Sequence, residues 1–71
     1  MTMNAWARWS EDNAAIARPF ERRWWATHGP DLAEDMSGCS YDQEVRQVWR
    51  TWRDRFLAAA EQLIREKAAA A

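Results

Sequence analysis

Six tryptophans in a chain of 71 residues constrain its fold more than any other feature of the sequence. Each indole is a large apolar ring with one N–H donor, so it needs other large side chains or an interface around it. A chain this short buries only about 60% of the surface that its unfolded state exposes, which leaves a lone core marginally stable. The tryptophans are therefore expected to form most of the core, with any surplus at an interface.

Covalent and metal stabilisation are not expected. A single cysteine, Cys39, excludes an internal disulfide. Together with a single histidine, His28, it falls short of the four ligands that a structural zinc site needs. We therefore expect no metal and no cofactor, which leaves large core side chains and self-association as the sources of extra stability.

The first part of the chain is predicted to be helical from about residue 4 to residue 28. Most of its large apolar side chains recur every three or four residues, as in a stripe along one face of a helix. Pro19 lies inside this stripe and predicts a break or kink, because proline loses a helical hydrogen bond. Gly29 followed by Pro30 predicts a helix end, and residues 29–41 are the predicted connection. The stripe consists of Trp6, Trp9, Asn13, Ile16, Phe20 and Trp24.

The second part of the chain is predicted to be one helix over about residues 42–68. Asp42 is a suitable N-cap. The apolar stripe again follows four- and three-residue spacing and consists of Val45, Trp49, Trp52, Phe56, Ala59 and Leu63.

These elements predict a single all-α domain over residues 1–71, folded as an antiparallel helical hairpin. Two helices alone cannot bury two wide apolar faces. We therefore expect two hairpins to pair as a homodimer, forming a four-helix bundle.

Charge and hydropathy indicate the cytoplasm as the location. The formal net charge is −1, so the chain as a whole is not attracted to nucleic acid. The first residues lack the basic and apolar regions of a secretory signal, and no stretch approaches the roughly 20 apolar residues of a membrane span. The lone cysteine is consistent with a reducing compartment.

The sequence does not indicate an enzyme. His28 and Cys39 flank the predicted connection and could in principle act as base and nucleophile, but no glycine-rich turn offers an oxyanion site. Phosphate loops, dinucleotide fingerprints and metal-ligand motifs are also missing.

Three arginines form a ridge on the second helix. Arg46, Arg50 and Arg53 lie at four- and three-residue spacing beside the tryptophan stripe. Such a ridge can contact nucleic acid, an anionic membrane or the acidic rim of a protein partner. Several carboxylates on the same helix favour the protein partner and disfavour the other two.

Most tryptophans fit the core, and two do not. Trp9, Trp24, Trp49 and Trp52 lie on the stripes. Trp6 lies at the end of its stripe, near the start of the chain, and Trp25 lies about 100° around the helix from Trp24. Exposed tryptophan beside arginine is typical of binding hot spots. The candidate partner-binding residues are Trp6, Trp25, Arg22, Arg46, Arg50 and Arg53.

Two segments resemble a pattern in small tailed-phage accessory proteins. Residues 19–25 (Pro-Phe-Glu-Arg-Arg-Trp-Trp) and 41–52 together read Phe-Glu-x-x-Trp followed by Tyr-Asp-x-x-Val-x-x-x-Trp-x-x-Trp. The pattern often has proline and alanine where this chain has Gln43 and Val48. These early host-takeover proteins include anti-quorum-sensing and anti-CRISPR proteins. The resemblance implies stoichiometric binding to a host protein, and no site residues are carried over.

The predicted function is thus a phage-encoded, non-enzymatic module that binds and inhibits a host protein in the host cytoplasm. A quorum-sensing transcription activator, a pilus-assembly protein or a defence component are the target classes. A small DNA-binding regulator that uses the Arg46/Arg50/Arg53 ridge is the alternative. A structural protein without a host target is a third possibility.

Overall fold

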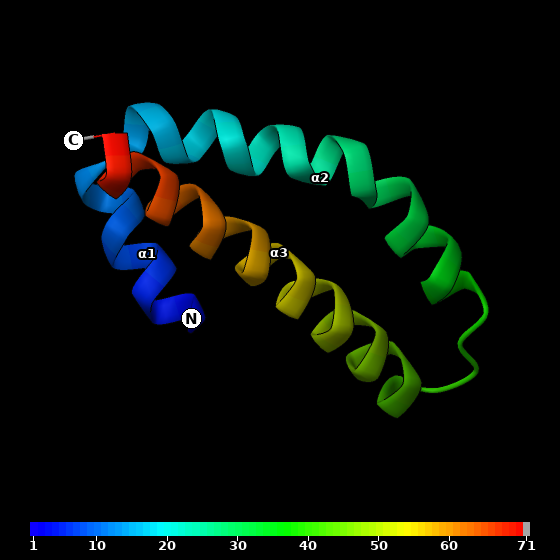
Figure 1. Ribbon diagram of the computed structural model, residues 1–71. Helices are drawn as coiled ribbons and strands as arrows, with labels where there is room; N and C mark the ends of the chain where they lie inside the picture. The colour runs from blue at the N-terminus through cyan, green and yellow to red at the C-terminus, as the bar shows by residue number, and fades with distance from the viewer. Residues whose placement is uncertain (71) are drawn as a thin grey trace.

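The computed structural model describes residues 1–70, which form three helices and no strand. The helices are α1 (Met3–Asp12), α2 (Ala14–Ser37) and α3 (Asp42–Ala70). Figure 1 shows α2 and α3 running in opposite directions, with α1 beside the end of the pair where α2 begins. The predicted all-α class is confirmed.

The first break in the helical chain lies at Asn13 and not at Pro19. Asn13 sits outside helical geometry, and both its backbone N–H and its side-chain Nδ2 donate to the carbonyl of Trp9, at 3.0 and 2.9 Å. Its own carbonyl accepts from the N–H groups of Ile16 and Ala17. Asparagine suits this double role because its side chain competes for backbone hydrogen bonds. The predicted stripe position of Asn13 is in fact the corner between α1 and α2.

Helix α2 continues through both prolines, so the predicted stop at Gly29 is wrong. The connection is residues 38–41 and not 29–41. Proline disfavours helical geometry in the residue before it because its ring meets that residue's Cβ. Gly29 has no Cβ, which lowers this cost before Pro30. Figure 1 shows α2 as an arch over α3, as expected for a helix with two prolines.

A hydrogen bond between helices accompanies the extra turns of α2. The indole Nε1 of Trp52 donates to Oδ2 of Asp35 at 2.8 Å. In the same turns Leu32 and Met36 are half-buried. These contacts favour helix over connection at residues 31–37, which local sequence signals alone do not reveal.

Helix α3 begins at Asp42 as predicted, but its cap is Tyr41. The carbonyl of Tyr41 accepts from the N–H groups of Glu44 and Val45 at 3.1 and 3.3 Å. The Glu44 side chain accepts in turn from the N–H of Ser40 at 3.4 Å. Asp42 is therefore the first helical residue, where its charge suits the helix dipole.

The core is built around one phenylalanine. The side chain of Phe56 is 1% exposed, and its ring lies 5.3–5.9 Å from four other aromatic rings. Three of those rings belong to α2 and one to α1. They are the rings of Trp6, Phe20, Trp24 and Trp25. Phe56 thus joins all three helices.

The buried face of α3 is wider than its predicted stripe. Leu57 and Ala60 are buried, although neither is one of the predicted stripe positions. Helix α1 supplies Trp6 to the same cluster, where it is 2% exposed. The turn at Asn13 brings α1 back over α3. One side of α3 therefore packs against α2, and the adjacent side packs against α1.

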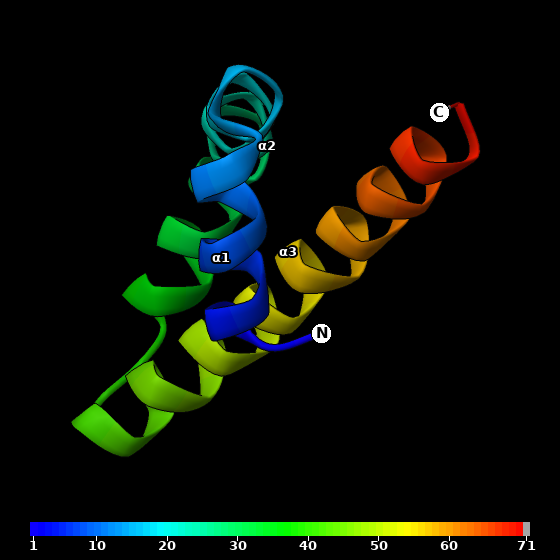
Figure 2. The ribbon, with the colours of Figure 1, turned by 90° about the vertical axis from the view of Figure 1, so that its left-hand side faces the viewer.

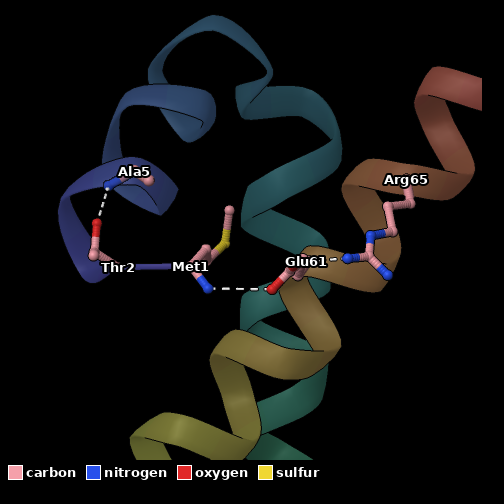
Figure 3. Close-up of polar contacts among 5 residues, drawn as sticks. All are labelled: Met1, Thr2, Ala5, Glu61 and Arg65. Carbon is pink, nitrogen blue, oxygen red and sulfur yellow. Dashed lines mark hydrogen bonds and ion pairs between the residues drawn. The ribbon is translucent and has the colours of Figure 1, made fainter.

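The start of the chain is joined to the middle of α3 by charge. Figure 3 shows the Met1 amine against Glu61 Oε2, at 3.1 Å, and Arg65 Nη2 against Glu61 Oε1, at 2.8 Å. Thr2 Oγ1 accepts from the N–H of Ala5 and caps α1. The hydrogen bond from the amine, followed by the charges of the amine and Arg65, lowers the pKa of Glu61 below its ordinary value.

Phe56→Ala should destabilise the fold by about 3–5 kcal/mol, because it removes a fully buried ring from contact with all three helices. Chemical denaturation followed by circular dichroism measures the change. Gln47→Ala, at an exposed position of the same helix, should stay within about 0.5 kcal/mol of wild type. If Phe56→Ala is unfolded outright, Phe56→Leu should fold with a smaller loss. Wild-type stability in Phe56→Ala would contradict this core.

Pro30→Ala should stabilise the chain by about 1–3 kcal/mol, because an exposed proline inside α2 is replaced by a good helix former. Thermal and chemical denaturation measure the change. Were Pro30 part of a connection, alanine would instead be neutral or destabilising, because it gives the unfolded chain more conformational freedom than proline does. The sign of the change therefore tests whether α2 extends to Ser37.

Glu61→Gln should make stability less dependent on pH. Because the pKa of Glu61 is lower in the folded chain than in the unfolded chain, its carboxylate contributes stability above the unfolded pKa, and this is lost as pH falls through the folded pKa. Denaturation midpoints of variant and wild type should differ at neutral pH and converge well below about pH 4. Glu11→Gln, an exposed carboxylate without an ion pair among residues 1–70, is the control. A constant difference at all pH values would contradict this role.

Candidate protein-binding surface

Helix α1 covers only part of the α3 face against which it packs. It spans 10 residues, whereas α3 spans 29. Met3, the first residue of α1, and Met1, which precedes the helix, line a depression together with Arg53 and Leu57. Trp49 lies one turn before Arg53 on α3, on the same side of the helix. This side of α3 is thus covered at Leu57 and uncovered at Trp49.

Two tryptophans stack at the uncovered end. The rings of Trp25 and Trp49 are 5.5 Å apart and 20° from parallel. Trp25 also stacks on Phe56 at 5.6 Å and meets the edge of Trp24 at 4.8 Å. Trp25 therefore connects an outer ring, Trp49, to the core.

The exposed tryptophan is not one of the two predicted. Trp49 is 43% exposed, although its stripe position predicted burial. Trp25 is half-buried between Trp49 and Phe56, so removing it affects the core as well as the surface. The predicted core position of Trp52 is confirmed, at 5% exposure.

Trp6 does not belong to this surface. It is 2% exposed and packs against Trp9, Phe20 and Phe56. The expectation that Trp6 lies at an exposed edge is wrong. Its position near the start of the chain suggested the edge of the stripe, but the turn at Asn13 folds it into the core.

The predicted arginines lie close in sequence to the stacked pair, on the same two helices. Arg46 and Arg50 are exposed, and they lie three residues before and one residue after Trp49. Arg22 is exposed one turn before Trp25 on α2. We call this set the Trp25/Trp49 surface; it consists of Trp25, Trp49, Arg22, Arg46, Arg50 and Arg53.

Arg53 is the least free of these arginines. Its Nη2 lies 3.3 Å from Asp54 Oδ1, and its Nε is buried without a hydrogen-bond partner among residues 1–70. The ion pair is solvent-exposed and contributes little stability. A partner carboxylate could replace Asp54 at low cost and would strengthen the guanidinium's hydrogen bonding.

Sequence reasoning missed a contact between an arginine and a tryptophan on α3. The guanidinium of Arg55 lies 4.5 Å from the centroid of the Trp52 ring, within the range of a cation–π interaction. The three-residue spacing of Trp52 and Arg55 was a usable signal. Trp52 is only 5% exposed, so its ring is not available to a partner.

The residues considered for catalysis have other contacts. His28 lies against Trp24, with ring centroids 4.2 Å apart, and Cys39 Sγ donates to the carbonyl of Asp35 at 3.5 Å. Within residues 1–70 no group of three or more His, Cys, Asp or Glu side chains could hold a metal ion. In the same range no helix has both the length and the apolar composition of a membrane span.

Comparison of the chain with protein-family models, with curated proteins and with solved structures finds no match.

Proposed function

We propose that this protein is a non-enzymatic binding module that blocks a partner protein through the Trp25/Trp49 surface. The observation that carries the proposal is Trp49, a large ring 43% exposed and held in place by stacking on Trp25. A ring already fixed in the free protein loses little rotamer freedom on binding. Tryptophan and arginine are also the residues that most often dominate binding energy at protein interfaces.

We propose further that the partner is a host protein and that the module is encoded by a phage. This part of the proposal is supported by the resemblance of residues 19–25 and 41–52 to small phage accessory proteins. A quorum-sensing transcription activator, a pilus-assembly protein and a defence component are the candidate targets. Inhibition by occupying a surface needs a rigid patch and no reacting groups.

Homodimerisation of an α2/α3 hairpin remains a prediction. Its support is the set of large apolar side chains that stay exposed, which includes Met1, Met3, Ile16 and Trp49. Because α1 already covers part of the hairpin, the apolar area that a second copy would have to cover is smaller than the sequence suggested. Sedimentation at micromolar concentration decides the question: a monomer would contradict the dimer.

A DNA-binding regulator is the alternative, since Arg46 and Arg50 are exposed on one helix. The formal net charge of −1 and the pairing of Arg53 with Asp54 weigh against it. Retention on DNA over a salt series separates the two functions, because phosphate contacts weaken steeply as salt rises.

Trp49→Ala should weaken partner binding by about 30-fold, the loss expected for a hot-spot residue worth roughly 2 kcal/mol. The tagged protein is first used to recover a stoichiometric partner from host lysate, and affinities are then measured with the purified partner. Arg50→Ala should also weaken binding, by a smaller factor.

Tyr41→Ala is the matched aromatic control, because Tyr41 is 62% exposed but lies in the connection before α3. Arg8→Ala, on the exposed side of α1, is the charge control. Circular dichroism should show all four variants folded. Equal affinity of Trp49→Ala and Tyr41→Ala for the partner would overturn the assignment of the Trp25/Trp49 surface.

A further inference from the structure

A second surface opens between the first half of α2 and the last half of α3. Figure 2 shows that these helices cross at an angle and separate toward the end of α3. The space between them is a groove of about 620 Å³, within the range of roughly 300–1,000 Å³ that is typical of ligand sites. None of its lining residues belongs to α1, the helix that covers Leu57 and Ala60.

The interior of the groove is apolar and partly uncovered. Ile16 is 37% exposed, and Phe20, Trp24 and Leu63 are half-buried. Phe20 and Trp24 continue directly into the core through Phe56. The apolar lining is therefore rigid, because its rings are held by the same contacts that hold the three helices together.

The charged lining of the groove has one sign. Arg23 stands on the α2 side and Lys67 on the α3 side, and no carboxylate lines the groove. Among residues 1–70 neither cation makes an ion pair. Both cations can therefore pair with carboxylates of a ligand without first breaking a contact within the chain.

The shape of the groove favours a helix over a small molecule. Its lining residues on α2 run from Ala15 to His28, a distance of about 20 Å at 1.5 Å per residue. An amphipathic helix of three to four turns has this length and presents one apolar stripe with polar residues on both sides.

We propose that this groove binds an acidic amphipathic helix of a partner protein. Apolar side chains of that helix contact Ile16, Phe20 and Leu63, and its flanking Asp or Glu side chains pair with Arg23 and Lys67. The groove does not share residues with the Trp25/Trp49 surface, so the proposal is independent of the function proposed above.

Two synthetic helical peptides of about 16 residues test the proposal. Both carry leucine at the same stripe positions, and they differ only in having glutamate or lysine beside the stripe. Titration into the isotope-labelled protein at low salt, where exposed charges are least screened, gives affinity and location together. The glutamate peptide should bind about tenfold more tightly than the lysine peptide, with chemical-shift changes centred on Ile16, Arg23, Leu63 and Lys67.

Charge reversal is the sharper arm of the experiment. In the double variant Arg23→Glu/Lys67→Glu, at two exposed positions, the preference should invert toward the lysine peptide. Ile16→Gln, which removes an apolar contact without adding charge, should weaken both peptides, and Trp49→Ala should change neither. Circular dichroism checks that each variant is folded.

Equal binding of the two peptides, an unchanged preference after charge reversal, or shifts centred on Trp49 would each overturn the proposal. The proposal would also be overturned if sedimentation showed a dimer in wild type that is lost in Ile16→Gln, because a second copy would then cover the groove.

Discussion

The contacts of one buried ring hold the three helices together. Phe56 lies within 5.3–5.9 Å of Trp6 from α1 and of Phe20, Trp24 and Trp25 from α2. Edge and stacked contacts both occur around it, with interplanar angles between 23° and 85°. Large aromatic side chains let a short chain bury much apolar area with few residues, which is the stabilisation that its size demands.

Both proposed surfaces follow from how this cluster is covered. Helix α1 is short, so it covers the α3 face at Leu57 and leaves Trp49 exposed. The crossing of α2 and α3 then leaves the groove at Ile16 and Leu63 open. Each surface is an outer edge of the aromatic core, so each presents rings that are already fixed. This arrangement suits a module that acts by binding, because rigid apolar side chains lose little entropy in an interface.

The course of α2 shows how tertiary contacts override local signals. Gly29 followed by Pro30 is a common way for a helix to end. In this chain the helix continues, and Trp52 on α3 donates a hydrogen bond to Asp35 in the turns beyond the proline. The partner of that bond lies 17 residues away along the chain, so no local pattern contains it. Asn13 is a similar case: its spacing predicted a position on a helical stripe, but it forms the turn between α1 and α2.

The sequence by itself determined the all-α class, the start of α3 at Asp42, the burial of Trp52 and Phe56 and the exposure of Arg22, Arg46 and Arg50. Three- and four-residue spacing and helix-forming residues are local properties, and they are sufficient for these features. Only the tertiary structure decided which tryptophans are covered. The turn at Asn13 placed α1 over Leu57, which buried Trp6 and left Trp49 exposed. A stripe shows which side of a helix is apolar, whereas the length and position of the neighbouring helix decide how much of that side is covered.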